Sequence, residues 1–259
     1  MPKLFEIIEE IEKTAPLALA ESWDNPGLML GRRDKEIKKV LTALDMDVGV
    51  AKEAIETGVD LVITHHPMIF HPLKSVTEDG GTGECVLMLA KHDIAVYSAH
   101  TNLDSAVGGT NDYLARLYGL ENVCAIPPEE GKETGIMRVG EIKETKNLET
   151  LAMDIKNKLG AKNVWYAGDK NRMIKRIAIC SGGGGKMYDE AIKAKADAYI
   201  TGDISYSSAR DAVEKGICLI HAEHYESEKY CGEIFKKILE RFNMEITFSK
   251  TNINIINHV

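Results

Sequence analysis

Apolar residues follow two alternating patterns along the chain, and the alternation predicts an α/β fold. Leu4, Ile7, Ile8 and Ile11 keep the period of an amphipathic helix over residues 3–13. Short apolar runs predict buried strands in KKVLTALDM, DLVITHHP, IAVYSAH, KRIAICSGGGG and GICLIHAEH. Helical segments such as VGVAKEAIETG and ECVLMLAKHD separate these runs. Strands that alternate with helices indicate mostly parallel sheets covered on both faces.

Residues 121–172 interrupt this rhythm. Pro127, Pro128 and Gly131 break the pattern, and RVGEIKE, NLETLAMDIKNKLG and VWYAG then predict a strand, a helix and a strand. We therefore expect a first α/β lobe over 1–120, a small α+β insert over 121–172 and a second α/β lobe over 173–259. These parts should form one compact unit that shares one metal site. WDNPGLMLG reads as a loop, and MEITFSK as a last edge strand.

An internal repeat relates the two expected lobes. AIETGVDLVITHHP (54–67) aligns with AIKAKADAYITGDI (191–204), with Ala, Ile, Asp and Ile-Thr at matching offsets. Two βα units with shared propensities would give the same likeness, but a duplicated half-domain explains it better. Sites in open α/β sheets form at the carboxyl ends of strands, and His65, His66, His100 and the His224 region all stand where strands end.

Composition narrows the protein class. The 259 residues carry a formal net charge of −8, which opposes nucleic-acid binding unless basic residues gather on one surface. The sequence shows no apolar run of the ~20 residues that a bilayer span needs, and its acidic, amphipathic start is unlike a signal peptide. The five scattered cysteines lack a CxxC pair. We expect buried reduced thiols in a cytoplasmic protein.

Imidazoles and one carboxylate after the first-lobe strands suggest metal ligands. His65 and His66 end an apolar strand before Pro67, where the turning backbone lets the two rings diverge toward two metals. Asp104 suits a hard divalent cation, although it could instead cap a turn. His100 could be a ligand, a proton carrier or an orienting group, and we favour the last two roles.

His224 and Glu228 complete the candidate metal site. They are four residues apart and share a helical face, a spacing that is also common on solvated surfaces. With His65, His66 and Asp104 they make five ligands for two divalent cations, with Glu228 chosen as the bridge. Mixed nitrogen and oxygen ligation suits Zn, Mn, Fe or Co. Open coordination positions are typical of a catalytic site, where metal-bound water becomes hydroxide at neutral pH.

The glycine-rich segment CSGGGGK lies between a strand and a helix. Such a turn can cradle a phosphate, or it can simply be tight. It is not a Walker loop, because Cys180 replaces the first glycine and Met187 replaces the magnesium-binding Ser or Thr.

As a set, WDNPGLMLG, ITHHPMIF, SAHTNLDSAVGGTND, CSGGGGK, ADAYITGD and HYESE resemble the Ngg-one-interacting-factor-three-like family, also named GTP cyclohydrolase I type 2 homologs. The resemblance runs over nearly the whole chain. It implies two related α/β lobes, a dinuclear metal site on the same five residues, and a homohexameric ring with metal sites facing an inner cavity. The chain departs from the family pattern at Ser207, where His is frequent, and at His221 and Glu223, where Asp and Gly are frequent.

Three functions fit these features. The first is a metal-dependent hydrolase acting on a nucleotide or related small molecule, as the cyclohydrolase name implies. The second is a ring that binds DNA or RNA, and the third is a regulatory protein that metals stabilise. The sequence predicts no membrane partner.

Overall fold

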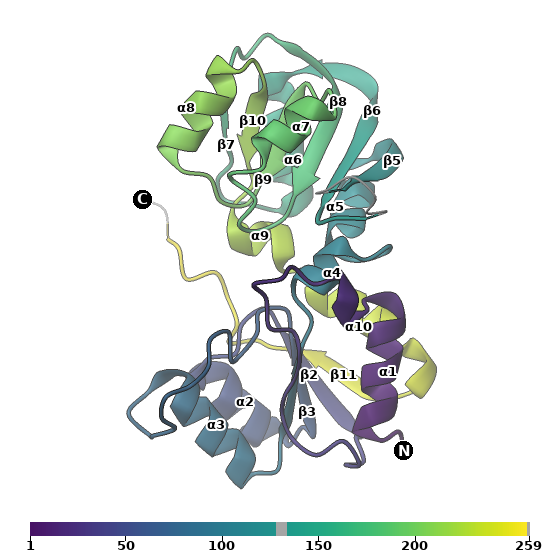
Figure 1. Ribbon diagram of the computed structural model, residues 1–259, viewed down its shortest axis with the longest axis vertical. Helices are drawn as coiled ribbons and strands as arrows, with labels where there is room; N and C mark the ends of the chain where they lie inside the picture. Colours follow the sequence, from purple (N-terminus) through teal and green to yellow (C-terminus); the bar gives the residue numbers. More distant parts are fainter. Residues whose placement is uncertain (128–133, 258–259) are drawn as a thin grey trace. The chain divides into compact units, whose positions relative to one another are not determined.

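The computed structural model describes residues 1–127 and 134–257, which form two compact units. The first unit contains residues 1–103 and 229–253, and the second contains residues 104–228 with the segment from 254 onward. Figure 1 shows that each unit is built on its own sheet with helices packed against it. Pro128 and Gly131, which we expected to break the pattern, lie outside the described residues.

The sheet of the first unit has five strands in the order β1-β4-β3-β2-β11. Strands β11, β2, β3 and β4 are parallel, and β1 pairs antiparallel with β4 at one edge. The strands span Gly27–Leu30 (β1), Lys39–Ala43 (β2), Leu61–Thr64 (β3), Ala95–Ser98 (β4) and Glu245–Phe248 (β11). The helices span Leu4–Thr14 (α1), Val48–Thr57 (α2), Gly81–Lys91 (α3) and Cys231–Ile238 (α10), with single 3-10 turns at Leu17–Leu19 and Glu240–Phe242.

Helices cover both faces of this sheet, which explains the continuous apolar strands. Leu41, Val62 and Val96 pack with residues of α2 and α3 in one buried cluster. The alternate residues, among them Leu61 and Ile63, are also fully buried, on the side where α10 contacts β2 and β3. Strands buried on both faces lose the polar alternation of half-exposed strands.

The sheet of the second unit has six strands in the order β5-β6-β8-β9-β10-β7. Strands β8, β9 and β10 are parallel, and the other pairings are antiparallel. The strands span Leu120–Ile126 (β5), Met137–Asn147 (β6), Trp165–Ala167 (β7), Met173–Cys180 (β8), Ala198–Thr201 (β9) and Cys218–His221 (β10). The helices span Thr110–Tyr118 (α5), Leu148–Leu159 (α6), Tyr188–Lys193 (α7), Tyr206–Glu214 (α8) and His224–Glu228 (α9). The short helix α4 (Thr101–Ser105) includes the last residues of the first unit and the first residues of the second along the chain.

The predicted internal repeat has the same local structure in both units. Strands β3 and β9 occupy matching positions in the two aligned segments, and a helix, α2 or α7, precedes each. The Asp60 carboxylate accepts hydrogen bonds from the N–H groups of Lys38 and Lys39 at 2.7 and 3.1 Å. Its counterpart Asp197 accepts the same bonds from Lys175 and Arg176 at 2.9 and 2.8 Å. Shared polar contacts at shared offsets support duplication over mere likeness of propensity.

The expected fold class is confirmed: two sheets with mostly parallel strands form an α/β protein. The structure divides the chain differently from the expected lobes, however. The described residues of 121–172 do not form a separate insert, because β6 pairs with β8 and β7 pairs with β10 in the same sheet. Pairing between strands that are distant in the sequence places β6 and β7 in the second sheet. A local break in the apolar pattern does not reveal such pairing.

Two strands, β1 and β5, were not predicted from the sequence. WDNPGLMLG was expected to be a loop, but its last part forms β1, a four-residue edge strand. The seven-residue β5 was also missed, because most of its residues are exposed and its apolar positions do not alternate with polar ones. Cys124 lies exposed on β5, so the expectation of buried thiols holds only for the other four cysteines. Among the described residues, no helix has the length and apolar character to cross a bilayer.

Candidate metal centre

Three imidazoles gather at the carboxyl ends of two neighbouring strands in the first unit. His65 and His66 follow β3, and His100 follows β4, which pairs parallel with β3. The ring centroids are 5.2 to 5.5 Å apart, and one nitrogen of each ring lies within 4.8 Å of the others. The three rings could therefore ligate a single ion.

Each of these three rings has its Nδ1 atom fixed by a hydrogen-bond acceptor. His65 Nδ1 donates to the Ala99 carbonyl at 2.9 Å, and His66 Nδ1 donates to Asp45 Oδ1 at 2.6 Å. His100 Nδ1 donates to Asp24 Oδ1 at 2.8 Å. Metal-binding histidines are usually oriented in this way, with Nδ1 bonded to a carbonyl or carboxylate and Nε2 directed to the metal.

Asp24 connects the loop before β1 to the histidine cluster. Its carboxylate accepts hydrogen bonds from His100, from the Thr101 N–H at 3.0 Å and from the Thr101 hydroxyl. Burial alone would raise the pKa of Asp24, but these hydrogen bonds and the charge of His100 lower it to about 2. Asp24 is therefore ionised at neutral pH and holds His100 in one orientation.

The second unit gathers His224, Glu228 and Asp104 around the turn that follows β8. On α9, His224 Nε2 lies 2.9 Å from Glu228 Oε2. Gly182 lies against this pair with φ +56°, and an added Cβ would come within 2.0 Å of Glu228 Oε1. The neighbouring Ser181 donates its hydroxyl to Asp104 Oδ1 at 3.4 Å. Only glycine permits the turn to approach the carboxylate so closely.

His224 is held between two carboxylates. Its Nδ1 donates to Asp203 Oδ2 at 2.6 Å, on the ring edge opposite Glu228. Burial lowers the pKa of His224, but the hydrogen bonds and charges of Asp203 and Glu228 raise it to about 10. The hydrogen bond from His224 in turn lowers the pKa of Asp203. Two acids around one imidazole give a site that favours positive charge, either a proton or a metal ion.

The five expected ligands therefore fall into two local groups. His65 and His66 converge with His100 in the first unit, and Asp104, His224 and Glu228 surround Ser181 and Gly182 in the second. That all five serve one pair of cations stays a prediction.

Sequence reasoning missed three aspartates that orient the histidines. Asp45, Asp203 and Asp24 accept the Nδ1 protons of His66, His224 and His100. The sequence could have indicated two of them, because each is a carboxylate just after a strand. Asp45 closely follows β2 and Asp203 closely follows β9, at the same sheet edges as the histidines.

Three positions left open by the sequence have defined surroundings. The His221 ring stacks on Trp165, with centroids 4.7 Å apart and planes 6° from parallel. Glu223 has a left-handed backbone with φ 61°, and Ser207 shares a hydroxyl hydrogen bond with Ser205 at 3.0 Å.

The glycines after β8 allow close packing. Cβ atoms at Gly184 and Gly185 would come within 2.5 Å of Tyr199 Oη and 2.3 Å of the Asp203 carbonyl. A tight turn, one of the two interpretations of CSGGGGK, is therefore correct for these glycines.

Comparison with known proteins identifies the family. The profile of the Duf34/NIF3 family (NGG1p interacting factor 3) matches residues 2–255. The chain belongs to this family. DUF34/NIF3 relatives include the GTP cyclohydrolase 1 type 2 homolog of Clostridium perfringens, which is 42% identical over 249 residues that cover 95% of each chain. The homolog of the same name from Methanocaldococcus jannaschii is 39% identical and covers 92% of this chain and 94% of its own length.

Solved structures of similar proteins share the fold. A Staphylococcus aureus hypothetical protein superposes with a TM-score of 0.92 at 31% identity, covering 99% of both chains. Reduced HcgD from Methanocaldococcus jannaschii superposes with a TM-score of 0.80 at 36% identity, covering 96% of this chain and 98% of its own. The resemblance drawn from the sequence motifs is confirmed.

Proposed function

We propose that the protein is a dinuclear metal-dependent hydrolase that acts on a nucleotide or a related small molecule. His65, His66, Asp104, His224 and Glu228 would hold two divalent cations, with Glu228 as the bridge. The carrying observation is the fixed orientation of the histidines: His65, His66 and His224 each donate Nδ1 to an acceptor at 2.6 to 2.9 Å. An isolated surface histidine such as His92 can also have a bonded Nδ1, but His65, His66 and His224 in addition lie beside further imidazoles or a carboxylate that could bind the same ion.

The donor set suits a borderline transition metal. Imidazole nitrogens with carboxylate oxygens fit Zn, Mn, Fe or Co better than Mg or Ca, which prefer oxygen alone. When bound, such cations supply hydroxide from water at neutral pH and stabilise a developing oxyanion. His100 would carry a proton or orient its neighbours, since Asp24 already holds its Nδ1.

Metal analysis tests the first half of the proposal. Protein purified without added metal should contain close to two transition-metal ions per chain by elemental analysis. His65→Ala and His224→Ala should each reduce this content, whereas His92→Ala should not. His92 is an exposed histidine at the end of α3 whose Nδ1 donates to the Met88 carbonyl. Full metal content in both site variants would reject these ligands.

Activity measurements test the second half. The names of the relatives motivate GTP as the first substrate, and metal-loaded protein should consume it with hydrolytic opening of the guanine imidazole ring. If GTP stays intact, a panel of nucleotides and phosphate esters tests the broader class. Inactivity on the whole panel with two metals bound would favour a regulatory role, in which chelation should disrupt the fold or the oligomer.

Assembly and DNA binding are separate proposals from the family resemblance. A hexameric ring would have six times the chain mass of 28.6 kDa when its mass is measured by light scattering. DNA binding by such a ring would have to overcome the net charge of −8 per chain. Gel retardation at low salt, with binding that falls steeply as salt rises, would support it. No retardation of single- or double-stranded DNA would remove it.

A further inference from the structure

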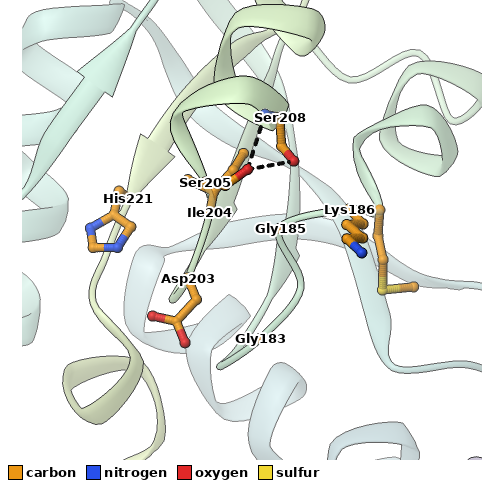
Figure 2. Close-up of a pocket in the computed structure, with 9 residues that line it drawn as sticks. Gly183, Gly185, Lys186, Asp203, Ile204, Ser205, Ser208 and His221 are labelled. Atoms are coloured by element: carbon orange, nitrogen blue, oxygen red, sulfur yellow. Dashed lines mark hydrogen bonds between the residues drawn. The ribbon is translucent and has the colours of Figure 1, made fainter.

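A pocket of about 520 Å³ lies in the second unit where β8, β9 and β10 end. The lining includes Gly183 and Lys186 after β8, Asp203, Ser205 and Ser208 after β9, and His221 at the end of β10. Figure 2 shows these residues around the pocket. Three neighbouring parallel strands thus deliver polar groups to one concavity, the usual place for a ligand in an open α/β sheet.

We propose that this pocket binds the phosphate group of a phosphorylated small molecule. The site is distinct from the metal ligands, and it goes beyond the proposed function because phosphate binding here does not require a metal.

One cation of the pocket is available for an anion. Lys186 is exposed, and it forms no ion pair with a carboxylate among the described residues. A lysine ammonium pairs with phosphate as a point charge, and charge-assisted hydrogen bonds are the stronger kind. Lys186 can therefore bind an incoming phosphate without breaking an existing ion pair.

Two hydroxyls complement this cation. The Ser205 hydroxyl donates to Ser208 Oγ at 2.9 Å and accepts from the Ser208 N–H at 3.2 Å. Figure 2 shows this pair at the pocket. Because Ser208 Oγ already accepts the Ser205 proton, its own proton is oriented away from Ser205 and can be donated to a phosphate oxygen.

Gly183 is the glycine of this turn that packing does not explain. Packing explains Gly182, Gly184 and Gly185, because a Cβ at each would come within 2.0 to 2.5 Å of another atom. A Cβ at Gly183 would meet nothing within 4 Å, and its φ is not left-handed. Neither packing nor backbone conformation requires this glycine. A phosphate that approached the backbone here would require it, as phosphates do in other glycine-rich turns.

The acidic group of the pocket stands apart from Lys186. Figure 2 places Asp203 and His221 on one side of the pocket and Lys186 on the other. The Asp203 carboxylate is engaged by His224 at 2.6 Å, which offsets part of its negative charge. The phosphate should therefore lie at the Lys186 and Ser208 side, with the rest of the ligand directed toward His221 and its stacked partner Trp165.

Titration with inorganic phosphate, followed by ³¹P NMR at constant ionic strength on chelator-treated protein, tests the site. Wild type should bind phosphate, and Lys186→Met should weaken binding roughly tenfold, which corresponds to about 1.4 kcal/mol. Gly183→Val fills the pocket and should abolish binding. Lys193→Met removes an exposed lysine from α7, outside the pocket lining, and should bind as wild type does. Circular dichroism confirms that each variant is folded.

The outcomes separate this site from the metal site. Absence of binding by wild type, or unchanged binding by Lys186→Met, overturns the proposal. Loss of binding in His224→Ala with full binding in Lys186→Met also overturns it, because the anion would then sit at the proposed metal ligands. Phosphate binding that depends on Lys186 and Gly183 supports the pocket even if elemental analysis finds no metal.

Discussion

Asp203 is the most informative position for testing how the candidate metal ligands are held. Its carboxylate accepts the His224 Nδ1 proton at 2.6 Å, a short charge-assisted hydrogen bond. Asp203→Asn keeps the shape and one acceptor oxygen but removes the negative charge. The imidazole then becomes a weaker ligand, and its ring is less firmly oriented. Loss of such a partner typically weakens metal affinity by about 10- to 100-fold.

The assay is competition with a chelator of known metal affinity. Asp203→Asn should lose affinity in this range, about 1.4 to 2.7 kcal/mol. Asp45→Asn should behave alike, because Asp45 makes the same 2.6 Å contact to His66 in the first unit. Asp189→Asn is the control, since Asp189 pairs with Lys215 on the surface.

A double variant shows whether Asp203 acts through His224. If it does, Asp203→Asn should add little to the loss already caused by His224→Ala, because the orienting contact is then absent. Equal losses in both backgrounds would refute the reasoning, as would wild-type affinity in Asp203→Asn alone. Either result would mean that the 2.6 Å contact has no part in metal binding.

Three further predictions concern stability and are measured by denaturant unfolding. Burial alone would raise the pKa of Glu53, but hydrogen bonds from residues 249–251 lower it. The ionised Glu53 carboxylate therefore contributes to the free energy of unfolding above the unfolded-state pKa of about 4.5, and this contribution is lost as pH falls through the lower folded-state pKa. Near pH 7, Glu53→Gln should cost about 1–2 kcal/mol. Gly232→Ala should cost about 1–3 kcal/mol, because its Cβ would lie 2.6 Å from the Phe248 ring. Arg138→Met should cost about 3–5 kcal/mol, since the buried guanidinium donates to four backbone carbonyls and pairs with Asp112.

Matched variants separate these effects from general perturbation. Glu56→Gln changes an exposed acid on the same helix as Glu53 and should leave the pH dependence of the free energy of unfolding unchanged. Arg210→Met removes an exposed arginine paired with Glu214 and should cost less than about 1 kcal/mol. If Glu53→Gln has the same stability profile as wild type between pH 3 and 7, the assigned role of its carboxylate is wrong.

The local pattern of apolar residues predicted those helices and strands that can be recognised without knowing their neighbours in the fold. The helix over residues 3–13 was recognised from its apolar period, and the strands ending at Thr64 and Ser98 from continuous apolar runs, because burial selects apolar residues at these positions. The i,i+4 spacing of His224 and Glu228 likewise predicted one helical face, and the two side chains meet on α9. These features depend on neighbours within a few residues along the chain.

Distant pairing set the limits of the prediction. The second sheet takes β6 and β7 as antiparallel neighbours of β8 and β10, and so absorbs the expected insert. Nothing in a local period specifies which strand lies beside which, because any two compatible backbones can pair. The mostly exposed β5 was not recognised, because its apolar residues do not alternate and its pairing with β6 shifts register between Glu121 and Cys124.

The sequence alone determined the alternation of strands and helices, the duplicated Asp60 and Asp197 segments, and which imidazoles and carboxylates stand at strand ends. Those properties can be read from local sequence, because the periods of helices and strands extend over only a few residues. Only the tertiary structure decided that Asp24 orients His100 across 76 positions of chain, and that Gly183 faces a pocket while Gly182 abuts Glu228. Such contacts arise because folding brings distant segments within a few ångströms, a distance that sequence separation does not encode.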